Sequence, residues 1–249
     1  MHKFFVPQEN FNGNEVIING EDVKHIYKVL RLKEGQSINI NNCNGQEFLA
    51  EIFSIGKAEV KCNIIKEIFL NNESPLKINL YQGLPKAAKM DLIAQKAAEI
   101  GVVSITPVIT ERVVVKNELG EYKKIDRWNR IALEASKQSK RTIIPKINDV
   151  VQFENMINEI KGLDLIVVPY EEQENYGIKS LIKDIEKDKI STAAVIIGPE
   201  GGFQSSEIEQ LKEVGAHIVT LGPRILRTET AGFVCSSLLM YELGDMGGK

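Results

Sequence analysis

The stretch that decides the fold is Gly198-Pro199-Glu200-Gly201-Gly202-Phe203, and it is joined by a second loop, Leu221-Gly222-Pro223-Arg224-Ile225-Leu226-Arg227-Thr228-Glu229-Thr230-Ala231. Each loop follows a short apolar run that is typical of a buried strand, at residues 193–197 and 217–221. Residues 206–214, between the loops, predict a helix. A strand, a helix and a second strand form a crossover unit, so we expect both loops at the same edge of a parallel sheet.

These two loops indicate a ligand site, because ligands in open α/β sheets bind outside the carboxyl ends of the strands. Glycines let the backbone approach a ligand closely, and prolines stiffen a loop. One such loop is usually an ordinary turn, but two at neighbouring strand ends, the second rich in charged side chains, favour a site. The first loop lacks the Lys-Ser/Thr of a nucleoside-triphosphate loop and the glycine spacing of a dinucleotide fingerprint. We therefore expect a different ligand.

Strands and helices alternate from residue 76 onward. Besides the two strands above, we expect strands at 77–82, 103–108 and 163–168, and helices at 86–100, 126–138, 153–160, 179–187, 206–214 and 230–241. This alternation predicts an α/β domain over residues 76–249, with a parallel sheet covered by helices on both faces.

The first 70 residues follow a different pattern and predict a small β-barrel domain. We expect strands at 16–18, 37–40, 46–53 and 58–69, and one helix at 21–32 with Val23, Ile26, Val29 and Leu30 on its apolar face. The Asn44-Gly45 pair is a hairpin signal between the second and third strands. A polar run closed by proline, at 71–75, is the expected domain junction.

The composition is that of a globular protein, with 43% hydrophobic and 26% charged residues. No run approaches the roughly 18 apolar residues of a membrane span, and the apolar run near the start is too short for a signal peptide. We therefore expect a cytoplasmic protein without membrane contact. Three scattered cysteines, and three histidines without an H-E-x-x-H pattern, argue against a disulfide framework and a metal site.

The net charge of −3 hides an asymmetry along the chain. Residues 84–146 carry 13 Lys/Arg and 7 Asp/Glu, whereas residues 147–213 carry 6 and 14. A basic block on an acidic protein indicates a face for a polyanion, although lysines that merely solvate helices would give the same count. Phosphate contacts position a nucleic acid without reading its sequence, so the block favours RNA in general.

Both loops resemble the signature of the SPOUT-type methyltransferases, and they are most similar to the ribosomal RNA small-subunit methyltransferase E family (RsmE). The resemblance extends over essentially the whole chain, through blocks at residues 25–31, 95–101, 111–112 and 134–141, with Pro145 beyond. Lys3 departs from the family, whose opening motif is expected to carry arginine there.

The resemblance implies S-adenosylmethionine-dependent methylation of N3 of a uridine in 16S ribosomal RNA, as free rRNA or within the small ribosomal subunit. For the fold, it implies a PUA-like N-terminal barrel that binds RNA and a SPOUT-type α/β domain with a C-terminal trefoil knot. General folding rules disfavour a knot, so that expectation depends on the resemblance alone. A homodimer is implied as well.

We expect the two loops to hold S-adenosylmethionine. Main-chain N–H and C=O groups of glycine-rich turns suit the edges of adenine, and apolar side chains beside them would either wall the pocket or belong to the core. The expected cofactor-binding residues are Ile197, Gly198, Glu200, Gly201, Gly202, Leu221, Gly222, Ile225, Leu226 and Arg227.

Methylation at uridine N3 requires the loss of a weakly acidic proton. Arg227 is the candidate for stabilising the anion that forms, and Glu229 and Glu200 are candidate bases. Arg227 could instead pair with one of these carboxylates, and either carboxylate could cap a helix or bind the methionine amine.

The basic block supplies the expected RNA contacts. Lys86, Lys89 and Lys96 have the spacing to share one face of the helix at 86–100. The full set of expected RNA-binding residues is Arg31, Lys86, Lys89, Lys96, Arg112, Arg130, Lys140 and Arg141.

Two other functions fit parts of the pattern. One is a SPOUT-type enzyme that methylates tRNA at a base or a ribose 2′-oxygen. The other is a noncatalytic RNA-binding protein with a PUA-like domain and a degenerate cofactor fold. The intact glycine loop, together with Arg227 and Glu229, argues against degeneracy.

Overall fold

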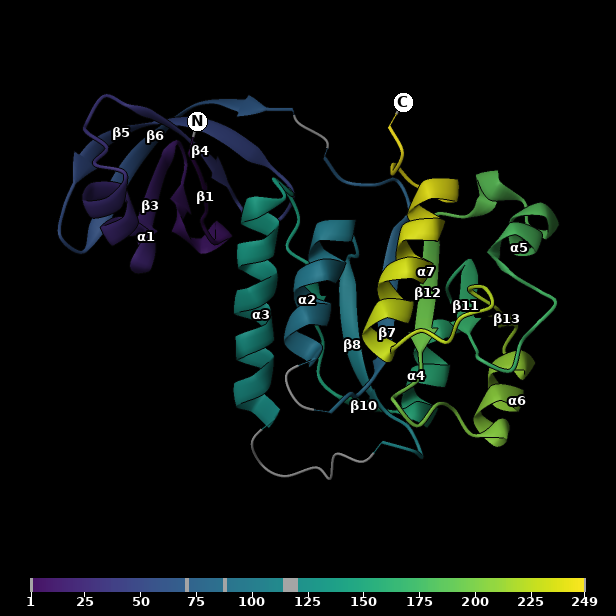
Figure 1. Cartoon of the computed structure of the whole chain (residues 1–249). Coiled ribbons are helices and arrows are strands. Elements are labelled where there is room, and N and C mark those ends of the chain that lie inside the picture. The colour runs from purple at the N-terminus through teal and green to yellow at the C-terminus, as the bar shows by residue number, and fades with distance from the viewer. Residues whose placement is uncertain (1, 70–71, 87–88, 114–120, 249) are drawn as a thin grey trace. The chain divides into compact units, whose positions relative to one another are not determined.

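The protein is described by a computed structural model that covers residues 2–69, 72–86, 89–113 and 121–248. The chain forms two compact units (Figure 1). Unit 1 comprises Met1–Glu73 with Ser136–Ile144, and unit 2 comprises Ser74–Ala135 with Pro145–Lys249. From the sequence, all residues beyond 75 were expected in the second domain. In the structure, residues 136–144 return to unit 1.

Unit 1 is built on a curled, mixed sheet that forms a half-barrel. Its strands are β1 (Lys3–Phe5), β2 (Phe11–Asn12), β3 (Glu15–Asn19), β4 (Ser37–Asn41), β5 (Glu47–Ile55) and β6 (Glu59–Ile68), in the order β1-β4-β5-β6-β3-β2. The β4–β5 hairpin predicted from Asn44-Gly45 is confirmed. Register shifts between β5 and β6 bend the sheet, but β1 and β2 do not pair in the described chain. The sheet therefore stays open.

The helix predicted at 21–32 is short and changes type. Helix α1 (Glu21–Lys24) passes into a π-helical turn, η2 (His25–Val29), in which the Leu30 N–H donates to the His25 carbonyl at 2.9 Å. Val29 was expected on the apolar face, but it is 68% exposed, whereas Ile26 is fully buried. The wider π turn changes the angular spacing of side chains, and this carries Val29 out of the core.

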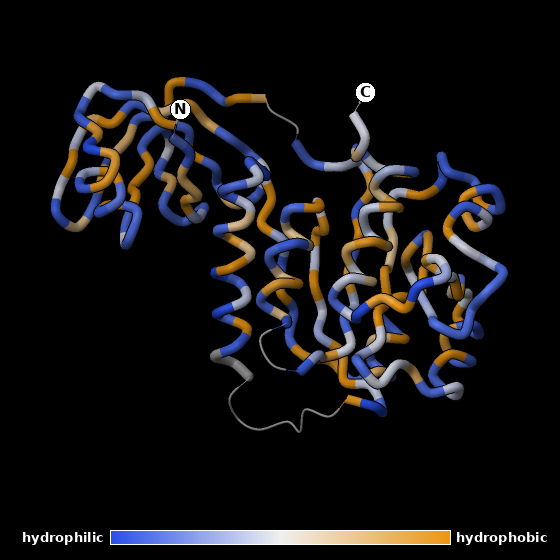
Figure 2. The backbone as a smooth tube through the Cα atoms, viewed as in Figure 1, coloured by the Kyte–Doolittle hydropathy of each residue, from blue (hydrophilic) through white to orange (hydrophobic). Residues whose placement is uncertain are grey.

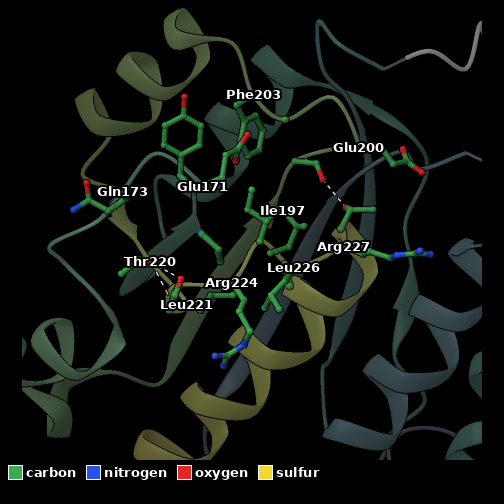
Figure 3. A pocket seen from close by; sticks show the side chains of 18 of the residues that line it. Glu171, Gln173, Ile197, Glu200, Phe203, Thr220, Leu221, Arg224, Leu226 and Arg227 are labelled. Atoms are coloured by element: carbon green, nitrogen blue, oxygen red, sulfur yellow. Dashed lines mark hydrogen bonds between the residues drawn. The ribbon is translucent and has the colours of Figure 1, made fainter.

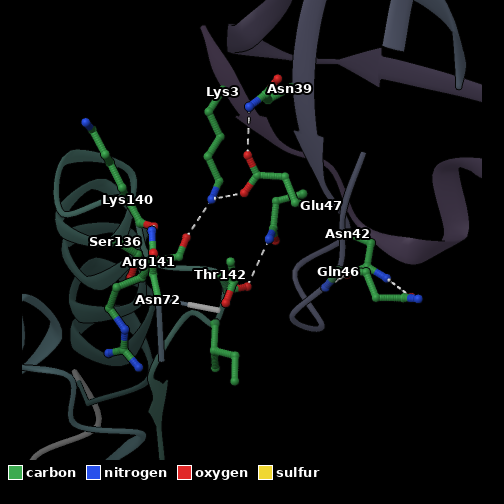
Figure 4. Close-up of polar contacts among 12 residues, drawn as sticks. Lys3, Asn39, Asn42, Gln46, Glu47, Asn72, Ser136, Lys140, Arg141 and Thr142 are labelled. Carbon is green, nitrogen blue, oxygen red and sulfur yellow. Dashed lines mark hydrogen bonds and ion pairs between the residues drawn. The ribbon is translucent and has the colours of Figure 1, made fainter. Parts of the chain in front are cut away.

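Residues 136–144 complete unit 1 through buried polar contacts. The Arg141 guanidinium lies 2.6 Å from the Glu73 carboxylate, which also accepts from the Thr142 N–H at 2.8 Å. Asn41 and Lys3 donate to the carbonyls of Thr142 and Arg141, at 3.0 and 2.9 Å (Figure 4). Arg141 was expected to contact RNA, but the structure places its guanidinium in a buried ion pair with Glu73.

Unit 2 contains a fully parallel sheet, which confirms the predicted α/β class. The strands that the structure describes are β7 (Lys77–Gly83), β8 (Ser104–Ile109), β9 (Lys146–Ile147), β10 (Val151–Gln152), β11 (Leu165–Pro169), β12 (Thr192–Ile197) and β13 (His217–Val219). Their order is β10-β8-β7-β12-β11-β13, with β9 also paired to β8. The short strands β9 and β10 were not predicted.

Helices cover both faces of this sheet. They are α2 (Lys89–Ile100), α3 (Glu121–Gln138), α4 (Phe153–Ile160), α5 (Ile178–Asp184), α6 (Ser205–Glu213) and α7 (Thr228–Leu243). Successive residues of a strand point to opposite faces of the sheet. Val195 belongs to the hydrophobic core that includes residues of α2, α3, α5 and α7, and Ile196 belongs to the core that includes residues of α4 and α6. Apolar residues accordingly follow the strands and the helices that lie on them (Figure 2). None of the described helices is long and apolar enough to cross a membrane.

The order of the strands corrects one expectation. Strands β12 and β13 were expected to be neighbours, but β11 lies between them and pairs with both. The loops after β12 and β13 still leave the same edge of the sheet, because all three strands are parallel. A third loop, after β11, therefore separates them. The trefoil knot stays a prediction.

Candidate functional site

A cavity of about 950 Å³ lies at the carboxyl edge of the sheet in unit 2 (Figure 3). Loops after β11, β12 and β13 form its walls, and the first turn of α7 and Lys89 of α2 complete it. Small-molecule pockets typically have volumes of roughly 300–1,000 Å³, so the cavity is large enough for a nucleoside with a substituent.

Most of the residues expected to bind a cofactor meet at this cavity. The nine that line it are Ile197, Gly198, Glu200, Gly202, Leu221, Gly222, Ile225, Leu226 and Arg227. The exception is Gly201, which is not among the lining residues and whose carbonyl accepts a hydrogen bond from Arg112 Nη1 at 3.0 Å.

Sequence reasoning missed the contribution of the loop after β11. This loop adds Tyr170, Glu171, Gln173 and Glu174 to the cavity, and Lys89, Thr220 and Thr228 line it as well. The omission follows from the wrong strand order, since β12 and β13 were treated as adjacent. A polar run directly after the buried strand at 163–168 was the available signal.

Two positions in the loop after β12 favour glycine. Gly202 has φ +68°, and a Cβ there would lie 2.5 Å from the Glu171 carboxylate. A Cβ on Gly198 would lie 3.2 Å from the Phe203 ring. Side chains at these positions would strain the backbone or displace the opposite wall, so the glycines keep the loops packed close around the cavity.

A buried chain of hydrogen bonds fixes the floor of the cavity. The Gln82 side chain, at the end of β7, is fully buried, and its Nε2 donates to Thr228 Oγ1 at 2.8 Å. The Thr228 hydroxyl in turn donates to the Gly198 carbonyl at 2.6 Å. Three elements, β7, the loop after β12 and α7, are thereby held in one arrangement.

A three-member charged cluster lies beside the cavity. Lys89 Nζ is 3.0 Å from Glu200 Oε1 and 3.2 Å from Glu229 Oε2, and the Lys86 N–H donates to Glu200 at 3.1 Å. Hydrogen bonding to Glu200 raises the pKa of Lys89. Burial alone would raise the pKa of Glu200, but the contact with Lys89 and the hydrogen bonds from the backbone N–H groups of Glu200 and Lys86 together lower it. Both groups are therefore charged near neutral pH.

The two candidate catalytic residues have different surroundings. Glu229 is 9% exposed and belongs to the Lys89 cluster, and it does not line the cavity. Arg227 lines the cavity with an exposed side chain, and its guanidinium extends in a different direction from that of Arg224 (Figure 3). Arg227 therefore has the freedom to reach a second substrate, whereas Glu229 is held in place.

Ionic side chains of both signs line the cavity and suit a ligand that carries both charges. They are Glu171, Glu174 and Glu200, with Lys89, Arg224 and Arg227. Apolar walls from Ile197, Leu221 and Leu226 lie between them. A zwitterionic ligand with an apolar body matches this arrangement better than a polyphosphate, because a polyphosphate would face three carboxylates.

The remaining RNA candidates divide between the two units. In unit 1, Arg31 and Lys140 are exposed. In unit 2, Lys86 and Arg130 are exposed, Arg112 contacts the loop after β12, and Lys96 pairs with Glu99 at 2.7 Å. Lys86, Lys89 and Lys96 were expected to share one face, but Lys89 pairs with the carboxylates of Glu200 and Glu229.

Comparison with known proteins gives consistent similarities along the chain. A family model described as an RNA methyltransferase domain matches residues 72–240, and one described as an RNA methyltransferase PUA domain matches residues 18–65. Two relatives named ribosomal RNA small subunit methyltransferase E are similar. The relative from Bacillus subtilis is 38% identical over 97% of each chain, and that from Aquifex aeolicus is 35% identical over 96% of this chain and 99% of its own.

A solved structure shows the same similarity in three dimensions. The ribosomal RNA small subunit methyltransferase E from Neisseria gonorrhoeae, bound to S-adenosyl methionine, aligns with a TM-score of 0.86 and 29% identity over 99% of both chains.

Proposed function

We propose that this chain, which belongs to the ribosomal RNA small subunit methyltransferase E family, methylates 16S ribosomal RNA with S-adenosylmethionine as the methyl donor. The observation that supports this most directly is the cavity at the carboxyl ends of β11, β12 and β13, lined by nine of the ten residues that the sequence assigns to the cofactor. The site we propose for N-methylation is N3 of a uridine.

The residues of the cavity fit S-adenosylmethionine. Its glycines, Gly198 and Gly202, let main-chain groups come close to a ligand, which suits the edges of adenine, and Ile197, Leu221 and Leu226 provide apolar contact. Carboxylates of Glu171 and Glu174 offer partners to a cationic ligand. When bound, S-adenosylmethionine supplies an already activated methyl group, so the protein's main task is to align the acceptor and exclude water.

Arg227 is the proposed catalytic residue. Its exposed guanidinium, at the rim of the cavity, would stabilise negative charge on the uridine as the N3 proton leaves. Glu229 is better placed as a fixed anion than as a mobile base, because Lys89 holds its carboxylate. Arg227 is the N-cap residue of α7, and Glu229 lies two residues later in the first turn of that helix. By pairing with Glu229, Lys89 thus helps to position the helix start that carries Arg227.

Exposed cations of both units are proposed to bind the RNA backbone. They are Arg31 and Lys140 in unit 1, and Lys86, Arg112 and Arg130 in unit 2. Such contacts would give affinity that falls with salt and carry no sequence information. Because the substrate is ribosomal RNA, we place the enzyme in the cytoplasm, with free rRNA or the small subunit as its partner.

A homodimer is the proposed assembly. Helix α7 exposes two large side chains with apolar surface, Leu238 and Tyr241, which are 37% and 64% accessible. Leu92 of α2, a helix that packs on α7, is 42% accessible. Exposed apolar side chains that gather on a surface often mark an interface, and a second copy of the chain would cover these. Tyr241→Glu should shift the sedimentation coefficient to that of a monomer.

The decisive experiment uses tritiated S-adenosylmethionine and small ribosomal subunits from a methylation-deficient cell, with nucleoside analysis after digestion. We expect labelled 3-methyluridine. Label in a tRNA nucleoside when bulk tRNA is offered would support the tRNA alternative instead. A protein that gives no heat of binding with S-adenosylmethionine in calorimetry would contradict the enzymatic proposal and support a noncatalytic RNA-binding role.

A further inference from the structure

We propose that the π-helical turn η2 of unit 1 is a stacking platform for an unpaired base of the RNA substrate. Tyr27 and Val29 would form its surface, and Lys28 and Arg31 would hold the adjoining phosphates. The inference depends on the proposed function for the identity of the ligand, because RNA is the substrate inferred above.

The first observation is that the π turn brings apolar side chains to the surface. Val23 and Ile26 are buried in the core of unit 1, whereas Tyr27 is 37% and Val29 68% exposed. An α-helical continuation would have placed Val29 on the same face as Val23 and Ile26. The wider turn presents an aromatic and an aliphatic side chain to solvent within three residues.

The second observation is the cationic surround of these side chains. Lys24, Lys28, Arg31 and Lys33 are all exposed, and Lys28 Nζ lies 5.7 Å from the centre of the Tyr27 ring. Of the neighbouring acids, Glu21 is exposed, whereas the other two are turned to other partners. Asp22 pairs with Lys137 at 3.5 Å, and Glu34 accepts from the Ile55 N–H at 3.1 Å. The local field around Tyr27 therefore favours an anionic ligand.

The third observation is the backbone of Arg31. Its φ is +52°, in the left-handed region that non-glycine residues rarely adopt, and its side chain is exposed. Such strain costs stability and persists where the surroundings impose it, most often at functional sites. Arg31 lies two residues beyond the end of the π turn, a second irregularity that is itself frequent at functional sites.

These three features together match single-stranded RNA. An unpaired base offers an apolar face that stacks on aromatic side chains, and its flanking phosphates pair with Lys and Arg. The family model described as an RNA methyltransferase PUA domain matches residues 18–65, and this range includes the whole π turn. A protein partner is the competing occupant, and the experiment below distinguishes it.

The test measures binding of the full-length protein to a fluorescein-labelled single-stranded RNA of about 20 nucleotides carrying the target uridine. Tyr27→Phe keeps the ring and should bind like the wild type. Tyr27→Leu keeps apolar bulk without the ring and should bind roughly tenfold more weakly, because base–aromatic stacking is lost. Lys28→Ala with Arg31→Gly should lower the slope of log Kd against log salt by about 0.7 for each phosphate contact removed. Glycine is chosen because it adopts positive φ freely.

Unit 1 provides a matched control in Ile65 and Lys66, an exposed apolar residue next to an exposed cation on β6. Ile65→Ala and Lys66→Ala should leave RNA affinity unchanged. Thermal unfolding midpoints of all variants should stay within a few degrees of the wild type, since every changed side chain is exposed.

Three results would overturn the proposal. The first is wild-type affinity in Tyr27→Leu, and the second is an equal loss of affinity in the Ile65 and Lys66 variants. The third is normal binding of naked RNA combined with loss of methylation only on intact subunits, which would assign the turn to a protein partner. Failure of the proposed function is separately visible, because the wild type would then show no transfer of label whatever the Tyr27 variants bind.

Discussion

The Gln82 side-chain amide donates to the Thr228 hydroxyl at 2.8 Å, which joins the end of β7 to the first turn of α7. Because the Thr228 hydroxyl in turn donates a hydrogen bond to the Gly198 carbonyl at 2.6 Å, the donor and acceptor at each step of this chain of hydrogen bonds are fixed. The loop that carries the essential glycines is thus positioned by a residue more than a hundred positions earlier in the sequence, which does not itself line the cavity.

Thr228→Val should weaken S-adenosylmethionine binding roughly tenfold. Valine matches threonine in shape but leaves the Gln82 amide and the Gly198 carbonyl without this partner, a loss of about 1–3 kcal/mol for buried groups. Thr228→Ser retains the hydroxyl and should bind nearly as well as the wild type. Calorimetric titration measures both, and equal affinity of the valine and serine variants would show that the hydrogen bond does not position the loop.

In the Lys89→Met variant, the affinity for S-adenosylmethionine should begin to fall at a higher pH than in the wild type as the solution is acidified. Contact with Lys89 lowers the pKa of Glu200, so the wild-type carboxylate stays ionised as pH falls below its ordinary value of 4.5. Without the cation, burial and the nearby Glu229 favour protonation, and the cluster loses its charge earlier. S-adenosylmethionine affinity measured from pH 7 to pH 4 tests this.

The control for that experiment is Lys212→Met, which removes a lysine paired to Glu209 at 2.8 Å on the exposed surface of α6. Its pH profile should overlay that of the wild type. A Lys89→Met profile that also overlays the wild type would remove the cluster from the cofactor site.

Arg227→Ala should reduce turnover at least a hundredfold while changing S-adenosylmethionine affinity by no more than a few-fold. The guanidinium is expected to act on charge that develops in the RNA base, and losing one such donor typically costs roughly 10²–10³ in kcat. Single-turnover methylation measures the rate and calorimetry measures the affinity. A large loss of cofactor affinity with an unchanged rate would instead assign Arg227 to cofactor binding.

Gly202→Ala should impair both stability and cofactor binding. Its φ of +68° disfavours alanine, and the new Cβ would lie 2.5 Å from the Glu171 carboxylate across the cavity wall. Gly215→Ala is the matched control, since Gly215 also has a positive φ, +84°, but open space around its Cβ position. The control should lose about 1 kcal/mol of stability through backbone strain and bind S-adenosylmethionine normally. Equal cofactor affinity in the two variants would contradict the crowding argument.

Glu73→Gln should destabilise unit 1 by about 3 kcal/mol, because it leaves the buried Arg141 guanidinium without its carboxylate. The pKa of Glu73 is lowered in the folded protein. Burial alone would raise this pKa, but the hydrogen bond and charge of Arg141, together with two backbone N–H groups, outweigh burial. Its contribution is therefore present above the ordinary carboxyl pKa and is lost as pH falls through the lowered value. Urea unfolding at pH 7 and pH 3 should show a smaller pH dependence in the variant.

Much of the site could be predicted from the sequence because its determinants are local. The glycines at 198 and 202 and the apolar runs before both loops are short-range signals, and a parallel crossover unit fixes that the loops share an edge. Helix existence was predicted well for the same reason. The π turn at His25–Val29 was not, because the sequence pattern there fits an α-helix, and the change of period arises where the turn packs on the sheet of unit 1.

The sequence by itself determined most of the longer strands and helices, that the sheet of unit 2 is parallel, and that the loops following residues 197 and 221 share one edge of it. Only the tertiary structure decided that β11 lies between β12 and β13, that Glu171 and Lys89 join the site, and that Arg141 is buried against Glu73. The physical reason is range. Periodicity and turn chemistry act over a few residues, whereas strand order and ion pairing depend on which distant segments bury each other's surfaces, and no local pattern records that choice.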